Sequence, residues 1–388
     1  MPLANSFKKE PQKNEFSFPL IAAICNSCWL FQIIEQPKPE LMFNENYPFF
    51  TGLSKYMNIH FEKYSKFVES FFREKIGKRR ILEIGCNDGT LLEKFNSEKF
   101  LQVGIDPSKN VLEKIQNNKI EKHLGFFDKS NGERLLSQYG KFDAIIAANV
   151  ICHISDINEL FETVFSLLND EGVFIFEEPY LLSMLKKVSY DQIYDEHVFI
   201  FSLLSVENLA RRHSFHLIDF RETDTHGGSA RYVLTKSLER TVTNNVRLQK
   251  DLEIKSRLDA LQTYQKFATE CEKNKILLYN YLCELKSQGK KVYGYAATSK
   301  STTILNYCNI GADLIISIGD STPEKQGTVT PGSIIPIISI EELRESNPDY
   351  VILFAWNHKN EILEKESNTM LSKAKWINIV PSLYVEEI

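Results

Sequence analysis

The sequence predicts an α/β protein: a parallel sheet covered by helices on both faces, a second α/β domain at the C-terminus and a small irregular module at the N-terminus. Short apolar strand patterns alternate with helical patterns between residues 61 and 240, which is typical of a parallel sheet. The same alternation returns between residues 289 and 388. Six prolines in the first 60 residues are spaced too closely for long helices.

The composition narrows the class of protein. The chain has 388 residues, of which 43% are apolar, so it is long enough for two or three domains. A formal net charge of -5 gives no overall basic field that would attract nucleic acid. No run of about 18 apolar residues is present, as a membrane-spanning helix would require. With no signal-peptide pattern and seven scattered cysteines, the sequence predicts a cytoplasmic protein with no disulfide framework and no nucleic-acid or membrane partner.

The elements of the first α/β domain follow in order. A helix is expected in "HFEKYSKFVESFFREKI", residues 60–76, where large apolar side chains recur every three or four residues. A strand, turn and helix follow in "RRILEIGCNDGTLLEKF", and further strands are predicted in "FLQVGID", "KFDAIIAANV" and "GVFIFEEP". "FHLIDFRETD" and "SARYVLTK" flank His226, Gly227 and Gly228, which predicts an antiparallel hairpin at a sheet edge.

The second half begins with a helical connector. Residues 241–288 contain neither proline nor glycine and are rich in helix formers. The second α/β unit then starts at "KKVYGYAATSKSTTILNYC" and has further strands in "LIISIGD" and "YVILFAW". The predicted division is a module at 1–60, a domain at 61–240, a connector at 241–288 and a C-terminal domain at 289–388.

The turn after the first strand of the larger domain, in "ILEIGCNDGT", is typical of a ligand site. Glu83, Gly85 and Gly89 give the spacing E-x-G-x-x-x-G, and glycines allow a ligand to approach the backbone closely. Asp106 ends the next strand, 21 residues after Gly85, where a carboxylate can accept both hydroxyls of a ribose. The spacing differs from G-x-G-x-x-G and no lysine follows the second glycine, so the pattern favours an adenosine cofactor other than NAD or ATP.

These features resemble the class I S-adenosylmethionine-dependent methyltransferases, which have a Rossmann-like domain. The resemblance implies S-adenosyl-L-methionine as the cofactor, with Gly85 and Gly89 near its amino acid part and Asp106 at its ribose. It places Asn149, which ends the strand in "AIIAANV", near the methionine moiety. The predicted cofactor-binding set is Glu83, Gly85, Asn87, Gly89, Asp106 and Asn149.

The segment "SYDQIYDEHVFIFS", residues 189–202, places polar side chains beside an apolar run, where an unpaired charge is costly. Methylation of carbon requires a base, because the acceptor carbon becomes a nucleophile only after it loses a proton. His197 is the most suitable base in the segment, and Glu196 or Asp195 can orient its imidazole. Tyr194 can donate a hydrogen bond to a carbonyl or enolate oxygen. The same four residues can also cap a helix or pair with one another at a domain seam.

Four stretches resemble the sugar C-methyltransferases of deoxysugar biosynthesis, and this resemblance extends over nearly the whole chain. They are "PLANSF" with "CNSCWLFQ", "ANVICHISDINEL", the segment around His197 with "HGGS", and "GYAATSKSTTILNYC" with "DSTPEKQGTVTPGSIIPI". The resemblance implies S-adenosylmethionine-dependent methylation of carbon 3 of a nucleotide-linked 4-keto deoxysugar through an enolate. It implies His197 as the base, with Tyr194 and Glu196 beside it and His153 as a second active-site histidine. Histidine is more common in that family where Asp195 stands.

The predicted substrate contacts come from two places. His226 lies at the predicted hairpin turn, where it can face the substrate. In the second α/β unit, small residues followed by Lys300 and Ser301 suit a diphosphate, although a turn with hydroxyl capping explains the same residues. The resemblance implies that this domain helps to hold the nucleotide sugar, so we expect contacts from Lys300, Ser301, and Lys325 or Gln326.

Cys25 and Cys28 form only half of a zinc site, since structural zinc normally has four ligands. The N-terminal module of the family has another CxxC pair upstream, and this chain starts at "MPLANSF", after that point. We therefore expect no tightly bound zinc and no other metal.

Three other functions are compatible with the same residues. An NAD-dependent sugar oxidoreductase would use the same type of fold and the same tyrosine and histidine chemistry. A noncatalytic nucleotide-sugar binding protein would account for the incomplete N-terminal module. An O-methyltransferase would share the cofactor domain, which does not specify the acceptor atom. The oligomeric state is left open.

Overall fold

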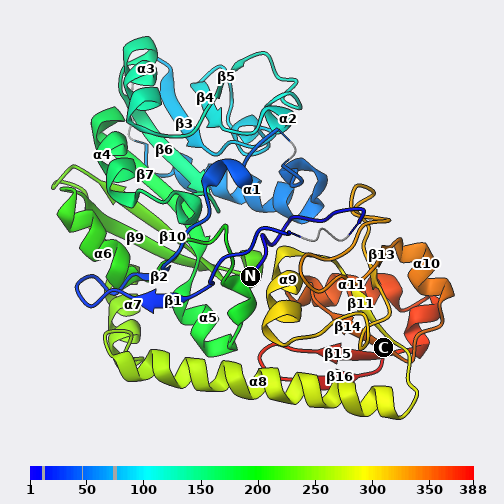
Figure 1. The fold of residues 1–388 in the computed structure, drawn as a ribbon. Helices are drawn as coiled ribbons and strands as arrows, with labels where there is room; N and C mark the ends of the chain where they lie inside the picture. The colour runs from blue at the N-terminus through cyan, green and yellow to red at the C-terminus, as the bar shows by residue number, and fades with distance from the viewer. Residues whose placement is uncertain (11–13, 46, 73–76) are drawn as a thin grey trace.

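The computed structural model describes residues 1–10, 14–45, 47–72 and 77–388, and its main feature is a seven-stranded sheet (Figure 1). The strand order is β5-β4-β3-β6-β7-β10-β9. The first five strands pair in parallel, whereas β10 pairs antiparallel with both β7 and β9. The strands are β3 (Arg79–Ile84), β4 (Phe100–Asp106), β5 (Ile120–Leu124), β6 (Phe142–Ala148), β7 (Leu168–Pro179), β9 (His216–Thr223) and β10 (Ser229–Thr235). The predicted hairpin is confirmed, and β9 forms the edge of the sheet.

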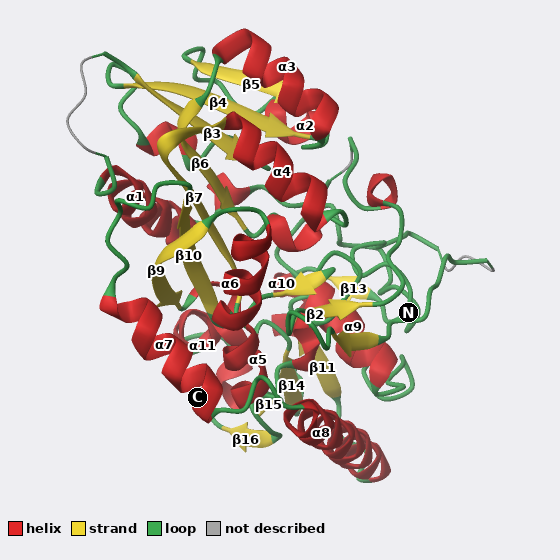
Figure 2. Cartoon of the chain, turned by 90° about the vertical axis from the view of Figure 1, so that its left-hand side faces the viewer, coloured by secondary structure: helices red, strands yellow, loops and turns green. Residues whose placement is uncertain are grey.

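Helices cover both faces of this sheet, as expected for strands that are apolar on both sides (Figure 2). Side chains of α3 and α4 belong to the core on one face, and those of α1 to the core on the other. The hydroxyl of Tyr64 on α1 donates to the backbone oxygens of Ala147 and Ile175, which fixes α1 across two strands. The helices are α1 (Lys55–Glu69), α2 (Lys109–Leu112), α3 (Lys129–Tyr139), α4 (Ile157–Leu167), α5 (Leu181–Lys187) and α6 (Leu203–Arg212).

The helix predicted at residues 60–76 begins earlier in the structure. The Ser54 side chain accepts a hydrogen bond from the backbone N–H of Met57 and caps α1, so the helix starts at Lys55. It ends at Glu69, and residues 73–76 of the predicted helix lie outside the described residues.

A small sheet ties the N-terminal module to the segment that follows His197. Its three strands are β1 (Ala22–Ile24), β2 (Phe31–Ile33) and β8 (Phe199–Ile200), in that order. Phe31 pairs with Ile200 and Gln32 pairs with Phe199, all antiparallel. The N-terminal module therefore contributes backbone hydrogen bonds directly beside the predicted catalytic segment.

The C-terminal residues form a second α/β unit, as predicted. Its six-stranded sheet has the order β13-β12-β11-β14-β15-β16, parallel except for β16. Its strands are β11 (Val292–Tyr295), β12 (Ile318–Gly319), β13 (Ile337–Ile338), β14 (Tyr350–Leu353), β15 (Lys375–Asn378) and β16 (Tyr384–Glu386), with helices α9 (Ser299–Tyr307), α10 (Ile340–Glu345) and α11 (Lys359–Glu366). Short 3-10 turns are η1 (Pro39–Leu41), η2 (Thr51–Leu53), η3 (Leu92–Lys94), η4 (Ile151–His153), η5 (Tyr190–Gln192), η6 (Thr225–Gly227), η7 (Trp356–His358) and η8 (Met370–Lys373).

The predicted connector consists of two helices, α7 (Asn244–Lys255) and α8 (Leu261–Ser287). They are separated at Arg257, whose φ of 55° is left-handed and incompatible with a continuous helix. Helix α8 runs along the base of the molecule toward the C-terminal sheet (Figure 1). Over the described ranges, every helix is too short or too polar to cross a lipid bilayer. The division into four parts at residues 60, 240 and 288 stays a prediction.

Helix α7 is held to the large domain by a buried carboxylate. Glu253 accepts hydrogen bonds from the Tyr180 hydroxyl at 2.7 Å and from the backbone N–H groups of Leu203 and Leu204 at 2.7 and 2.9 Å. The last two are at the N-terminus of α6, where N–H groups lack helical partners. Burial raises the pKa of Glu253 to about 7, although these hydrogen bonds oppose the rise.

We predict that Glu253→Gln changes how stability depends on pH. Between pH 4.5 and about 7 the folded protein holds a proton that the unfolded chain releases, so the contribution of Glu253 to stability falls as pH rises through this window. The rise in pKa from 4.5 to about 7 corresponds to roughly 3 kcal/mol. The free energies of unfolding of the neutral Gln variant and of wild type are measured by urea unfolding followed by circular dichroism. The value for the variant minus that for wild type should rise by roughly this amount from pH 5 to pH 8. Glu133→Gln, at an exposed site, is the control, and the same pH trend in both variants would contradict the assignment.

Candidate active site

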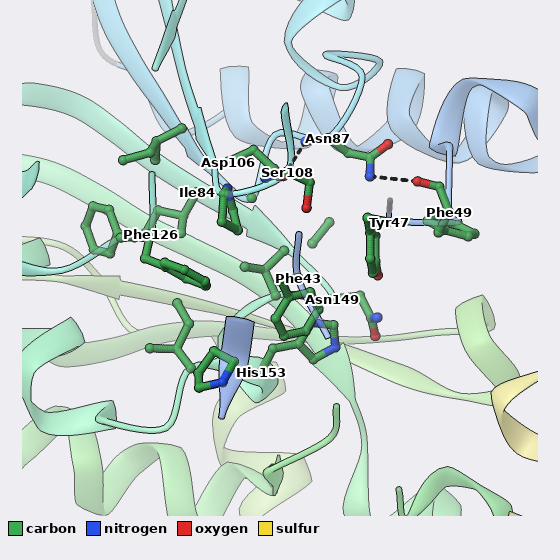
Figure 3. Close-up of a pocket in the computed structure, with 18 of the residues that line it drawn as sticks. Phe43, Tyr47, Phe49, Ile84, Asn87, Asp106, Ser108, Phe126, Asn149 and His153 are labelled. Atoms are coloured by element: carbon green, nitrogen blue, oxygen red, sulfur yellow. Dashed lines mark hydrogen bonds between the residues drawn. The ribbon is translucent and has the colours of Figure 1, made fainter. Parts of the chain in front are cut away.

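A pocket of about 280 Å³ lies where β3, β4 and β6 end (Figure 3). The carboxyl ends of parallel strands are the usual ligand-binding edge of such a sheet. Six of the residues predicted from sequence line this pocket: Gly85, Asn87, Asp106, Asn149, His153 and His226.

Asp106 is fixed in the pocket by two backbone donors. Its two carboxylate oxygens accept hydrogen bonds from the N–H of Asn87 at 3.0 Å and of Ser108 at 2.8 Å. Burial raises the pKa of Asp106, although these two N–H groups oppose the rise. A carboxylate has about four lone-pair sites, so two remain for the hydroxyls of a ligand.

The first glycine turn brings backbone close to the pocket. Gly85 has a φ of 65°, and a Cβ at this position would collide with the side chain of Val150. Asn87, two residues later, also has a left-handed φ, of 49°, and its side chain faces the pocket rim (Figure 3). The turn is therefore shaped by steric limits that favour glycine and asparagine at these positions.

Residues of the N-terminal module form one wall of the pocket, which the sequence reasoning missed. Phe43, Tyr47 and Phe49 line the pocket. The Asn87 side chain donates to the backbone oxygen of Phe49 at 3.1 Å and accepts from the N–H of Thr51 at 3.1 Å (Figure 3). This irregular segment has no local sequence pattern that would predict its position.

Two of the predicted cofactor residues do not line the pocket. Glu83 is 3% exposed and lies within β3, immediately before the pocket-lining Ile84, so its side chain points to the other face of the sheet. Burial raises the pKa of Glu83 well above its usual value, and Asp88 and Asp106 raise it further. Gly89 has a φ of 75° and packs beside Ile115, which indicates a role in the turn.

A buried carboxylate network supports the opposite wall. Glu177, which also lines the pocket, accepts hydrogen bonds from His60 at 2.7 Å, Thr225 at 2.8 Å and the Arg231 guanidinium at 2.6 Å. Burial alone would raise the pKa of Glu177, but the His60 hydrogen bond and the Arg231 charge lower it to about 2. Thr225 is next to His226, so the network fixes the loop that carries this histidine. Glu177 lies near the end of the predicted strand "GVFIFEEP", a signal that would have identified it.

The predicted base lies directly behind the pocket. The rings of Phe43, His153, His197 and Tyr194 form a stack with successive centroid distances of 5.2, 5.5 and 4.2 Å. Phe43 and His153 line the pocket, whereas His197 and Tyr194 form the layer behind them. The His153 ring therefore lies between the pocket and His197.

The hydrogen bonds of His197 fix its tautomer. Its Nδ1 is 2.9 Å from the backbone oxygen of Gln192, which can only accept, so Nδ1 carries the proton. Its Nε2 is 2.9 Å from the Tyr194 hydroxyl and therefore accepts. Burial lowers the pKa of His197 well below its usual value, and the neighbouring His153 lowers it further. The imidazole is neutral and its basic nitrogen faces Tyr194.

Asp195 and Glu196 are held by the N-terminal "PLANSF" stretch. Asp195 accepts from the N–H of Ala4 at 2.9 Å, and Glu196 accepts from the Asn5 side chain at 2.6 Å. The pocket-lining Tyr47 is also hydrogen-bonded to Glu196. Burial raises the pKa of Glu196, and the adjacent Asp195 raises it further.

The four predicted contacts from the C-terminal domain all have partners within the protein. Lys325 donates to the backbone oxygen of Ala297 at 2.7 Å, and Gln326 donates to that of Asp320 at 3.0 Å. Ser301 forms a reciprocal capping box with Thr298 at the start of α9. None of the three is brought to the pocket.

Lys300 connects the C-terminal domain to the pocket. Its amine donates to the backbone oxygen of His226 at 3.0 Å and lies 4.7 Å from the centre of the Trp356 ring. The Trp356 indole donates to Asp191 at 2.6 Å, and a Cβ at Gly227 would collide with its ring. Lys300 and Trp356 therefore hold the His226 loop from the side of the second sheet.

Cys25 and Cys28 lie at the turn between β1 and β2, and both are partly exposed. Across the described residues, no third cysteine, histidine or carboxylate joins them in a group that could hold a metal ion. This pair does not fit a closed four-ligand zinc site.

The chain matches three protein-family models in succession. The model "Putative zinc binding domain" matches residues 1–43, "Methyltransferase domain" matches 56–219, and "C-methyltransferase C-terminal domain" matches 224–381.

Individual proteins and solved structures are also similar to this chain. The C-methyltransferase NovU of Streptomyces niveus is 29% identical over 371 residues, which cover 95% of this chain and 87% of NovU. The tRNA U34 carboxymethyltransferase of Campylobacter lari is 30% identical over 172 residues, which cover 39% of this chain and 56% of that protein. The solved structure of the PH0226 protein of Pyrococcus horikoshii covers 47% of this chain and 92% of its own, with 18% identity and a TM-score of 0.37.

We predict that Arg231→Ala destabilises the fold strongly, whereas Arg221→Ala does not. The two arginines are cross-strand neighbours, but Arg231 pairs with the buried Glu177 and Arg221 is largely exposed beside Asp219. Loss of Arg231 removes the guanidinium partner of a buried carboxylate, which costs about 3–5 kcal/mol. Loss of the half-exposed Arg221 costs about 1 kcal/mol or less, because its buried partner Asp219 keeps hydrogen bonds from Thr243 and Asn245. Urea unfolding of both variants measures this, and an equal cost for the two would contradict the network.

Proposed function

Because the chain belongs to the S-adenosylmethionine-dependent C-methyltransferases, we propose that it methylates carbon 3 of a nucleotide-linked 4-keto deoxysugar through an enolate. The observation that carries the proposal is the tautomer-fixed His197, stacked on the pocket-lining His153. Methylation of carbon requires a base beside the methyl-donor pocket. Methylation of a hydroxyl oxygen depends less on such a base. With the enzyme class given by the family models, an NAD-dependent oxidoreductase is no longer an alternative.

The pocket fits the cofactor. Asp106 offers free lone pairs for ribose hydroxyls, and Gly85, Asn87 and Asn149 bring backbone to the same edge of the sheet. S-adenosylmethionine, when bound, supplies an electrophilic methyl group on a sulfonium sulfur. We propose Asp106 as the ribose ligand and Asn149 as a contact of the methionine part.

The chain's own residues then account for the activation of the acceptor. His197 accepts the proton from carbon 3 at Nε2, and the electrons of the C–H bond move into the enolate. For this step the Tyr194 hydroxyl turns from His197 to the keto oxygen, where it donates a hydrogen bond to the developing negative charge. Such bonds often rearrange between the free and the substrate-bound enzyme. Burial of both rings excludes water and strengthens these interactions.

We propose that the C-terminal domain holds the nucleotide part of the substrate. The ammonium groups of Lys300 and Lys325 each have three donors and donate one hydrogen bond to a backbone oxygen, which leaves two for a diphosphate. Gln326 directly follows Lys325 in the sequence, and we propose it as a contact for that reason. Ser301 is the weakest candidate of the four, because its hydroxyl both donates and accepts within its cap. A cytoplasmic location stays a prediction.

We predict that Asp106→Ala lowers the affinity for S-adenosylhomocysteine about 10- to 100-fold, because hydrogen bonds to a charged group are lost. Isothermal titration calorimetry measures this directly, without any sugar substrate. Asp170→Ala is the matched control, because Asp170 is exposed, with 87% of its side chain accessible, and does not line the pocket. Wild-type affinity in the Asp106 variant would refute the assigned ribose contact.

We predict that wild-type enzyme exchanges the carbon-3 proton of a nucleotide-linked 4-keto deoxysugar with deuterated water when S-adenosylhomocysteine occupies the pocket. His197→Asn should slow this exchange and methyl transfer at least about 100-fold, because the base is lost. Proton NMR follows the exchange, and NMR of the product locates the methyl group.

The controls separate chemistry from folding. His213→Asn changes a partly exposed histidine outside the pocket and should retain activity, and S-adenosylhomocysteine binding to His197→Asn should match wild type. Exchange at the wild-type rate in His197→Asn would reject this base. A methyl group on oxygen in the product would favour an O-methyltransferase instead.

A further inference from the structure

We propose that Cys152, His153 and His197 together bind a soft divalent cation such as Zn²⁺, and that the bound cation inhibits methyl transfer. The three residues each offer one ligand atom, and these atoms all lie within 4.8 Å of one another. The group is distinct from the Cys25–Cys28 pair. Binding of the cation is independent of the proposed function, whereas the inhibition rests on His197 as the base.

The ligand atoms come from two segments that the fold brings side by side. Cys152 and His153 are consecutive in η4, and His197 lies in the loop before β8. All three side chains are buried, with 0%, 9% and 3% exposure respectively. The two imidazole rings are stacked, with centroids 5.5 Å apart and an interplanar angle of 22°, so one ring must rotate on binding for both in-plane lone pairs to reach one ion.

His153 has a nitrogen that nothing in the described structure satisfies. Its Nε2 is buried and has no hydrogen-bond partner among the described residues. A buried polar atom without a partner is uncommon and suggests an unoccupied ligand position. Because His153 lines the pocket, a small cation has a route to this atom from solvent.

The donor set selects the type of cation. One sulfur and two imidazole nitrogens are preferred by Zn²⁺ and similar ions, whereas Mg²⁺ and Ca²⁺ prefer oxygen ligands. In a tetrahedral zinc site with bonds of about 2.0–2.3 Å, ligand atoms are about 3.3–3.6 Å apart, so ligand atoms at the 4.8 Å limit must approach by about 1.2–1.5 Å.

Groups next to the three ligands can balance the positive charge of the bound cation. On binding, the Cys152 thiol releases its proton to water and the sulfur binds as a thiolate. The Glu178 carboxylate, which accepts from the N–H of Ile151 at 2.7 Å and also contacts Cys152, offsets the positive charge of the ion. His197 releases the Tyr194 hydroxyl, so the metal takes the place of that hydrogen bond at Nε2.

Inhibition follows from the use of one lone pair for two purposes. The Nε2 electrons of His197 that bind the cation are the electrons that would accept the carbon-3 proton. A loaded site therefore has no base, although the cofactor pocket around Asp106 remains free.

Binding is tested with Co²⁺ as a spectroscopic probe. The full chain carrying Cys25→Ser and Cys28→Ser, reduced and freed of metal by chelation, is titrated with Co²⁺. We expect the near-ultraviolet charge-transfer band of a cobalt thiolate, with visible bands of tetrahedral Co²⁺.

Adding Cys152→Ser or Cys152→Ala should abolish the charge-transfer band, whereas Cys271→Ser, at another buried cysteine, should retain it. His153→Asn should weaken binding. Two substitutions at Cys152 and a circular dichroism spectrum of each separate loss of the ligand from loss of the fold.

Inhibition is tested separately with Zn²⁺. The concentration that halves the rate, measured against each variant's own metal-free rate, should rise at least about tenfold in Cys152→Ser and stay unchanged in Cys271→Ser. A charge-transfer band that persists without Cys152, or equal inhibition of both variants, would overturn the site. Stimulation by Zn²⁺ would overturn the inhibitory role. If no sugar is methylated, the proposed function fails, yet the Co²⁺ titration still decides whether the site exists.

Discussion

The position of the candidate base depends on one constraint: each polar group buried where the three parts of the chain meet needs a hydrogen-bond partner. The segment from Tyr194 to His197 is an irregular loop, and its partners come from distant residues. Ala4 and Asn5 bind its two carboxylates, and the hydroxyl of Thr303 on α9 donates to the backbone oxygen of Ile193. The loop is therefore ordered by the N-terminal stretch and the C-terminal domain together, and the seven-stranded sheet alone would not hold it.

The C-terminal sheet affects the pocket indirectly, through side chains that contact the His226 loop. Lys300 and Trp356 touch the His226 loop from one side, and the Glu177 network reaches the same loop through Thr225 from the other. His226 adopts a left-handed φ of 53° between these two supports. This arrangement explains why a domain that contributes no lining residue to the pocket can still influence the geometry there.

The sequence predicted the parts of the site that follow from regular structure. Asp106 ends β4 and Asn149 directly follows β6, and these two parallel strands flank β3, so their place at one edge was predictable, and both line the pocket. Glu83 lies in β3, between those two strands, but its side chain faces away from the pocket, because side chains alternate between the two faces of a sheet. Phe43 and Tyr47 were not predictable, since their irregular segment is positioned by tertiary contacts such as those of Asn87. Local sequence equally could not show that Ser301 is used in a helix cap.

The three-stranded sheet of β1, β2 and β8 has a consequence for the engineering of this enzyme. Recombination of segments between relatives usually assumes that each domain can be exchanged as a unit. Here the hairpin at residues 22–33 completes a sheet whose last strand follows His197 within three residues. A chimera that replaces the N-terminal module alone would mismatch strand pairs beside the catalytic loop. Crossover points that keep residues 1–33 and 189–202 from the same parent avoid that mismatch.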